Sequence, residues 1–306
     1  MMTSGDLLYS DNIVLGANQY GKAECRLVKV TRDSERHEIE DLSITSQLRG
    51  DFADVHLHGD NANCLPTDTQ KNTVYAFARD GVGSPEEFLL RLGRHFTANF
   101  DAVSGGHWAA EQYEWQRISV DNEPHNHAFV RSGQETRTAN VTVDGDNIWV
   151  ISGLTDLVVL KSTGSEFHGF QRDPYTTLPD AHDRILATSV TAHWRYLSEK
   201  QDFNGMYAKV KSILLTTFAN LHSLALQQTL FAMGKAVLEA CPDIAEIKFS
   251  MPNKHHFNVD LGAFGLDNPN EVFFAADRPY GLIEATVQRE STRATPLAWT
   301  SVTGFC

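Results

Sequence analysis

The chain has 306 residues, of which 42% are hydrophobic and 21% are charged, and its formal net charge is −13. This length suits about two domains, and the composition is that of a globular protein and not of a disordered one. The negative charge argues against a nucleic-acid partner, because a phosphate backbone requires a basic face. We expect no membrane span and no secretory signal, because no long apolar run is present and Lys22 is the first basic residue.

The first half of the chain is expected to contain two strands, two helices and two more strands. The second helix has a clear start, because Ser84 can cap it, Pro85 suits its first position and Glu87 follows three residues after the cap. Thr67 and Gln70 have the spacing of a capping box for the first helix. The expected elements are strands over 20–31 and 42–48, a polar loop over 56–66, helices over 67–79 and from 84 onward, and strands over 106–118 and 129–143.

The second half repeats this order after Asp144-Gly145, a dipeptide typical of hairpin turns. Pro252 is expected to end a strand, since it has no N–H to donate. The tail over 291–306 is polar, and we expect it to be poorly ordered alone. The expected elements are strands over 148–161 and 184–196, helices over 206–220 and 224–241, and strands over 244–251, 271–275 and 280–289.

This duplicated order predicts an α+β protein made of two similar units, each with helices on one face of an antiparallel sheet. The hairpin at Asp144-Gly145 would join the two sheets into one continuous sheet, whose edges must be covered or closed by another subunit. The expected division is a first unit over 12–145, a second unit over 146–290 and a tail over 291–306.

One short stretch, 251–258, carries groups suited to chemistry. Asn253, His255 and His256 follow directly after an expected strand, where a rigid scaffold can orient them. Asparagine and histidine hydrogen-bond small polar substrates, and histidine moves protons near neutral pH. A polar turn with surface histidines is the alternative interpretation.

Seven runs of residues, taken together and in this order, are similar to those of the urate oxidase (uricase) family. The resemblance extends from Tyr20 to Arg289. The runs are 20–22 (YGK), 67–75 (TDTQKNTVY), 167–170 (FHGF), 172–178 (RDPYTTL), 183–186 (DRIL), 227–230 (QQTL) and 252–255 (PNKH).

The resemblance implies a fold, an assembly and an activity. The family has the tunnelling fold (T-fold), in which each subunit contains two tandem β-β-α-α-β-β units. Two subunits close a barrel, and two barrels stack into a homotetramer with active sites at subunit interfaces. The family oxidises urate with O₂ and water to 5-hydroxyisourate and hydrogen peroxide, and it uses no metal, flavin or haem. Urate, O₂ and further copies of the chain are therefore the expected partners.

The resemblance also implies a catalytic set and a substrate-binding set. Lys22, Thr67 and His255 match a proton relay in which the lysine acts as base, a role that requires burial or a neighbouring cation. Asn253 and Thr67 match the residues that hold O₂ or peroxide above the urate ring.

The remaining matches bind urate itself. Phe167 matches a stacking aromatic ring, and Arg184 matches an arginine that grips the anion with two parallel hydrogen bonds. Gln227 matches an amide that pairs with the pyrimidine edge, while Leu226 and Asp68 match backbone N–H donors. In the family, Lys22, Thr67, Asp68 and His255 come from one subunit, and Phe167, Arg184, Leu226, Gln227 and Asn253 come from the other.

The sequence departs from the family pattern at three positions. Gln228 replaces a small residue after the pairing glutamine. His168 and His182 stand where tryptophan is common. The C-terminal Thr-Gly-Phe-Cys is not a peroxisomal address, and four cysteines without CxxC spacing suggest free thiols. We therefore expect a cytoplasmic enzyme of the bacterial type.

Three other functions stay open at this point. A metalloenzyme could use His56 with His58, or His125 with His127, because histidines two apart on a strand can bind zinc or copper together. Another T-fold enzyme acting on purines or pterins is a second possibility. A purine-binding protein without catalytic activity is the third.

Overall fold

A computed structural model describes residues 13–276 and 278–302. Its chain forms two compact units. The first runs to Gly133 and includes Arg137–Ile151 and Thr295–Ser301, and the second contains Gln134–Thr136 and Ser152–Ala294. In the described residues the architecture is α+β, with a mostly antiparallel main sheet and six α-helices.

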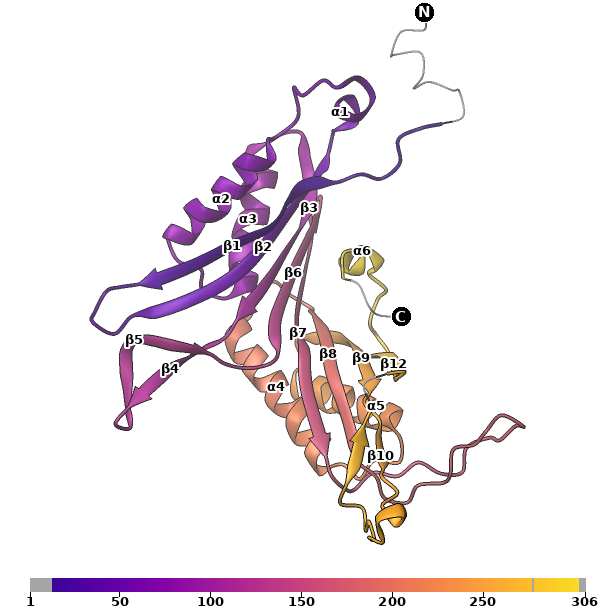
Figure 1. The fold of residues 1–306 in the computed structure, drawn as a ribbon. Helices are drawn as coiled ribbons and strands as arrows, with labels where there is room; N and C mark the ends of the chain where they lie inside the picture. Colours follow the sequence, from indigo (N-terminus) through magenta and orange to yellow (C-terminus); the bar gives the residue numbers. More distant parts are fainter. Residues whose placement is uncertain (1–12, 277, 303–306) are drawn as a thin grey trace, which may run out of the picture. The chain divides into compact units, whose positions relative to one another are not determined.

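The first unit places two long helices against a sheet with the strand order β1-β2-β3-β6-β7 (Figure 1). Helix α2 packs on β1 and β2, and α3 packs on β3. A core of large apolar side chains lies between these layers, with Phe96 stacked on Trp108 at 6.3 Å between ring centroids. The elements are β1 (Tyr20–Thr31), β2 (Glu38–Gly50), α1 (Ala53–His58), α2 (Thr67–Arg79), α3 (Pro85–Asn99), β3 (Val103–Tyr113), β4 (Trp115–Val120), β5 (Glu123–Arg131), β6 (Thr136–Asp144) and α6 (Pro296–Trp299). Strand β7 (Asn147–Lys161) begins in this unit and continues into the second.

The second unit has the strand order β7-β8-β9-β12, with β8, β9 and β12 paired antiparallel. Helix α5 packs on β9 and β12, and α4 packs on α5. Each helix buries an apolar stripe, for example at Leu214 of α4 and Met233 of α5. The elements are β8 (Leu186–Tyr196), α4 (Phe203–Asn220), α5 (Leu226–Ala240), β9 (Ile244–Asn253), β10 (His256–Asn258), a 3₁₀ turn (Gly262–Phe264), β11 (Phe273–Ala275) and β12 (Gly281–Gln288).

Most expected elements are confirmed. Strand β1 and helix α2 have the expected bounds, and α3 begins with a full capping box in which Ser84 and Glu87 bond each other's backbone N–H. Two expectations for the first half were wrong. The polar loop begins with helix α1, and each of the strands expected over 106–118 and 129–143 is two strands. The extra strands, β4 and β5, form a separate ladder with mostly exposed side chains, so burial leaves little pattern to mark their ends.

Two expectations for the second half also need correction. Pro252 does not end its strand, because β9 continues to Asn253 and Pro252 pairs with Leu282 of β12. A proline is tolerated in a strand where its nitrogen is not required as a ladder donor. The tail expected to be poorly ordered contains α6, in which Ala298 is buried.

The cysteines that the structure describes are free thiols, as expected. Cys25 and Cys241 are buried and Cys64 is partly exposed, and all three are free, while Cys306 lies outside the described residues. Among the described residues, no helix is long and apolar enough to cross a membrane.

Candidate active site

A cavity of about 700 Å³ in the second unit brings together four of the residues expected to form the site. Its walls include Phe167, Arg184, Asn253 and His255. This volume lies within the range of pockets that bind small molecules.

Phe167 and Arg184 come from the long excursion between β7 and β8, and backbone hydrogen bonds fix them relative to each other. The N–H and C=O of Phe167 exchange hydrogen bonds with Ala181, at 2.8 and 2.9 Å. The Arg184 N–H donates to the Ser165 carbonyl at 2.9 Å, and its Nε donates to Ser165 Oγ at 3.3 Å. The segment around Phe167 and the segment around Arg184 therefore form a short hydrogen-bonded ladder that positions both side chains.

The guanidinium of Arg184 lies beside an aromatic ring and is partly buried. It lies 5.2 Å from the centroid of the Phe167 ring, and burial lowers the pKa of Arg184 from its usual value. The neighbouring Asp183 does not pair with it, and the Asp183 carboxylate accepts from the Thr163 hydroxyl at 2.8 Å. No carboxylate neutralises Arg184 among the described residues. A planar anion beside the Phe167 ring would supply the missing charge.

Asn253 and His255 enter the cavity from the end of β9. Asn253 pairs with Thr188 of β8 and Gly281 of β12. His255 is held by its backbone, since its carbonyl accepts the Ala276 N–H at 2.9 Å. Burial lowers the pKa of His255, and the positive charges of Arg184 and His256 lower it further. The imidazole is therefore neutral near neutral pH and can accept a proton.

The start of α5 carries Leu226 and Gln227, and it is tied to the segment that carries Phe167. The Glu166 N–H donates to the Ser223 carbonyl at 2.7 Å, and the Ser223 N–H donates to the Gly164 carbonyl at 2.9 Å. Neither Leu226 nor Gln227 belongs to the wall of the cavity. Both lie in the first turn of a helix, where backbone N–H groups are free to bind a ligand.

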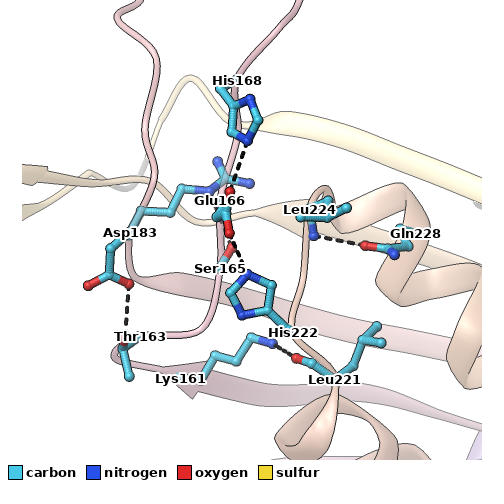
Figure 2. A network of polar contacts seen from close by, with 11 residues as sticks. Lys161, Thr163, Ser165, Glu166, His168, Asp183, Leu221, His222, Leu224 and Gln228 are labelled. Atoms are coloured by element: carbon cyan, nitrogen blue, oxygen red, sulfur yellow. Dashed lines mark hydrogen bonds and ion pairs between the residues drawn. The ribbon is translucent and has the colours of Figure 1, made fainter.

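The two adjacent glutamines have different surroundings. The Oε1 of Gln228 accepts the backbone N–H of Leu224 at 2.8 Å, which closes the turn before the helix (Figure 2). Gln227 is exposed, and its amide has no hydrogen-bond partner among the described residues. This difference supports Gln227 as the amide available for a substrate.

In the first unit, Lys22 lies at a β-bulge of β1. The strand bulges between Lys22 and Cys25, and Glu24 has a φ of 55°. Bulges of this kind redirect side chains beside functional sites. Gly21 allows β2 to approach closely, because a Cβ at this position would lie 1.8 Å from the Ser46 carbonyl oxygen. Lys22 itself is partly buried.

Thr67 is the first residue of α2 and does not cap it. The N-cap is Pro66, which has no side-chain hydrogen bond, so the expected capping box was wrong. The reason is that Gln70 is fully buried and its Oε1 accepts the hydroxyl of Ser46 on β2 at 3.0 Å. The hydroxyl of Thr67 has no hydrogen-bond partner among the described residues, which leaves it available to a ligand.

Asp68 follows on the exposed side of α2. Its carboxylate pairs with Lys71 at 2.5 Å and accepts the Asn72 amide at 3.0 Å. The hydrogen bond and charge of Lys71 lower the pKa of Asp68, and Asn72 and the charge of Lys22 act in the same direction. The Asp68 side chain is thus occupied, and its backbone N–H lies in the first turn of the helix.

Several residues of the cavity wall were not expected from the sequence. They include Asn258, whose amide donates to Asn270 Oδ1 at 2.9 Å, and Phe273, which pairs with Asn258 across β10 and β11. Asn258 belongs to the polar stretch after β9, so its position was a usable signal. Asn270 is brought to the cavity by the pairing of two three-residue strands, which no periodicity reveals.

The histidine pairs considered as metal ligands do not gain a third ligand among the described residues. His56 and His58 lie in α1 and not on a strand, and His56 Nδ1 bonds the Phe52 carbonyl. His125 and His127 do lie together on β5, with ring centroids 4.5 Å apart.

Comparison with known proteins gives a consistent result. The family model described as Uricase matches residues 18–142 and 150–284. A uricase of Arthrobacter globiformis is 60% identical over 306 residues, which are the full length of both chains. A uricase of Dictyostelium discoideum is 37% identical over 281 residues, covering 90% of this chain and 98% of the relative.

Solved structures agree with these relatives. The crystal structure of the Arthrobacter globiformis uricase has a TM-score of 0.90 and 63% identity, and the match covers 93% of this chain and 98% of that chain. A urate oxidase of Bacillus sp. TB-90 has a TM-score of 0.79 at 22% identity, covering 89% and 100%, which shows a shared fold. The chain therefore belongs to the uricase family.

Proposed function

We propose that this chain oxidises urate with O₂ and water to 5-hydroxyisourate and hydrogen peroxide. As a member of the uricase family it is a urate oxidase. The observation that best supports this substrate is the pairing of Phe167 with Arg184 at the wall of one cavity. A flat aromatic face beside an unneutralised guanidinium suits a planar heterocyclic anion.

Substrate binding in this proposal uses both side chains and backbone. The ring of Phe167 stacks on the urate plane, and Arg184 donates two parallel hydrogen bonds to adjacent acceptors of the anion. Gln227 offers a donor and an acceptor to the pyrimidine edge. The backbone N–H groups of Leu226 and Asp68 donate to oxygen atoms of urate.

Proton transfer is assigned to Lys22, Thr67 and His255. Lys22 accepts a proton through the hydroxyl of Thr67, and His255 with a water molecule completes the chain. The unpartnered Thr67 hydroxyl and the neutral His255 imidazole support these roles. Once deprotonated, urate gives one electron to O₂, which removes the spin restriction on their direct reaction. Asn253 and Thr67 position the oxygen species above the ring.

The proposed assembly follows the family. Two tandem T-fold units, over 12–145 and 146–290, form one continuous sheet per subunit. Two subunits close a barrel, and two barrels form a homotetramer with active sites at subunit interfaces. Lys22, Thr67 and Asp68 belong to the first compact unit, whereas Phe167, Arg184, Gln227 and Asn253 belong to the second. His255 also belongs to the second unit and lines the same cavity as Arg184 and Asn253, so its expected origin in the other subunit, with Lys22 and Thr67, was wrong. The free thiols of Cys25, Cys64 and Cys241 support a reducing compartment such as the cytoplasm.

The test is a set of parallel measurements on purified, EDTA-treated protein. Loss of the ultraviolet absorbance of urate is followed together with O₂ uptake and peroxide release. Equal amounts of all three would support the proposed reaction. Tight urate binding without O₂ uptake would contradict it and favour a purine-binding protein without catalytic activity.

A further inference from the structure

At the cavity, donor atoms of Glu166, His168 and His182 lie close together, and His222 bonds the second carboxylate oxygen of Glu166. His168 Nε2 lies 2.9 Å from Glu166 Oε2, and His222 Nε2 lies 2.5 Å from Glu166 Oε1 (Figure 2). The rings of His168 and His182 have centroids 4.6 Å apart. One ligand atom each of Glu166, His168 and His182 lie within 4.8 Å of one another.

The chemistry of this cluster suits a divalent transition metal. Glu166 offers two carboxylate oxygens, each of which already bonds a histidine nitrogen. Imidazole nitrogen and carboxylate oxygen are ligands that zinc, and ions similar to it, accept in proteins. The two imidazoles that bond Glu166 are well exposed, with 41% of the His168 side chain and 59% of the His222 side chain accessible, so an ion can enter from solvent.

The backbone under the cluster is fixed by the hydrogen bonds already described. Glu166 and His168 are two residues apart on a segment bonded to Ala181, so both side chains leave from the same side of it. His182 directly follows Ala181 on the returning segment. His222 directly precedes Ser223, whose carbonyl accepts the Glu166 N–H. Three separate segments therefore contribute ligands from positions that the backbone already holds together.

We propose that Glu166, His168 and His182, with His222 as the fourth ligand, form a binding site for Zn²⁺ or a similar divalent ion. Tetrahedral zinc with bonds of about 2.0–2.1 Å needs ligand atoms about 3.3 Å apart. The ligand atoms of Glu166, His168 and His182 lie within 4.8 Å of one another, so small side-chain rotations bring them to this spacing, and His222 would turn in from its bond to Glu166 Oε1. The site is distinct from the proposed urate chemistry, which uses none of these four side chains.

A bound ion would affect the neighbouring pocket by holding together the backbone segments that form it. The three segments that carry the ligands also carry Phe167, Arg184 and the start of α5. A bound ion would therefore hold these three segments together and raise the stability of the excursion between β7 and β8. This consequence needs no change in the chemistry of urate oxidation.

The first experiment is calorimetric titration of Zn²⁺ into the full-length, chelator-stripped protein near neutral pH. We expect one ion per chain. His168→Ala and His182→Ala should each weaken binding by about tenfold or more, since each removes a ligand. His222→Ala should do the same.

The matched control is His125→Ala, which removes one histidine from the two-histidine pair on β5 and should bind Zn²⁺ as the unchanged protein does. Circular dichroism without metal checks that each variant is folded. The absorption spectrum of bound Co²⁺ in the unchanged protein gives a second measurement, with the bands of a four-coordinate nitrogen and oxygen site expected. Absence of stoichiometric binding would overturn the proposal and leave a hydrogen-bonded cluster. The same conclusion would follow if the His168 and His182 variants bound Zn²⁺ as tightly as the unchanged protein does.

Discussion

The hydroxyl of Tyr20 bonds both backbone groups of Leu65. It accepts the Leu65 N–H at 2.8 Å and donates to the Leu65 carbonyl at 3.0 Å. Tyr20 stands two residues before Lys22 on β1, and Leu65 stands two residues before Thr67 at the start of α2. This single side chain therefore links the two segments that carry the proposed base and its hydroxyl relay.

Removing this hydroxyl should affect both stability and turnover. We expect Tyr20→Phe to lower the free energy of unfolding by about 1–3 kcal/mol, because two partly buried backbone groups lose their partner. Turnover should fall with it, since Thr67 is no longer held relative to β1. The control is Tyr75→Phe, whose exposed hydroxyl donates one hydrogen bond of 3.3 Å to the Arg26 carbonyl and should matter little. Similar losses in both variants would contradict the assigned role.

Gly21 should tolerate no side chain. Its added Cβ would meet the backbone oxygen of Ser46 at 1.8 Å, and paired strands cannot separate locally without losing ladder bonds. We expect Gly21→Ala to cost about 3 kcal/mol or more of folding free energy, measured by urea unfolding. Gly16→Ala is the control, since nothing lies within 4 Å of its added Cβ. Equal stability of the two variants would disprove the close approach.

The relay assignment predicts a separation of kinetic constants. Lys22→Ala and Thr67→Ala should lower kcat by about a hundredfold or more while changing KM little, because a positioned base acts mainly in the transition state. Lys29→Ala, on the same strand, is the control. Its Nζ donates to the Arg79 carbonyl at 3.4 Å, far along the strand from Lys22. Normal turnover in the Lys22 and Thr67 variants would rule out the relay.

The same substitution should affect substrate binding at Gln227 and folding stability at Gln228. Gln227→Ala should raise KM for urate by about tenfold with unchanged stability, since it removes a free amide that meets the substrate. Gln228→Ala should instead lower the free energy of unfolding by about 1 kcal/mol, because the Leu224 N–H loses its acceptor. If the KM effect belonged to Gln228, the register of the resemblance would be off by one residue.

His107 should make the fold sensitive to acid. It is buried on β3 beside the Thr142 hydroxyl, and burial lowers its pKa to about 4, with the charge of Arg49 as a smaller cause. The unfolded chain binds this proton near its ordinary pKa of about 6.5, so the neutral form stabilises the fold above that pH. This stabilisation is lost progressively as the pH falls from about 6.5 toward about 4.

The matched measurement is urea unfolding at about pH 7 and about pH 5 at a fixed protein concentration. Across this range His107 should account for a loss of about 2 kcal/mol, which His107→Gln should abolish because glutamine does not titrate. His58→Gln is the control, since His58 is an exposed residue of α1. An unchanged pH slope in His107→Gln would show that another group causes the acid sensitivity.

Periodicity and end signals were enough to predict most of the elements. The apolar stripes on α4 and α5 identify the buried faces of these helices directly, because burial selects apolar side chains at the period of a helix. The start of α3 was predicted to the residue, because its capping box is a contact among four consecutive residues. Local contacts of this kind are encoded locally.

The errors occurred where distant segments compete for a residue. Gln70 of helix α2 has the spacing of a capping partner, but its amide oxygen accepts a hydrogen bond from Ser46 of strand β2. Pro252 has the character of a strand end, but β12 pairs with it. In both cases a partner far along the chain changes the outcome, and such partners are invisible to local patterns.

The amino-acid sequence by itself determined the elements, the family and the identities of the proposed site residues, because these depend on residue types and short spacings. Only the tertiary structure placed Phe167, Arg184, Asn253 and His255 around one cavity and gathered Glu166, His168, His182 and His222 beside it. The reason is physical. Convergence of side chains depends on hydrogen bonds between backbone segments tens of residues apart, such as Glu166 to Ser223, and these form only once the chain has folded.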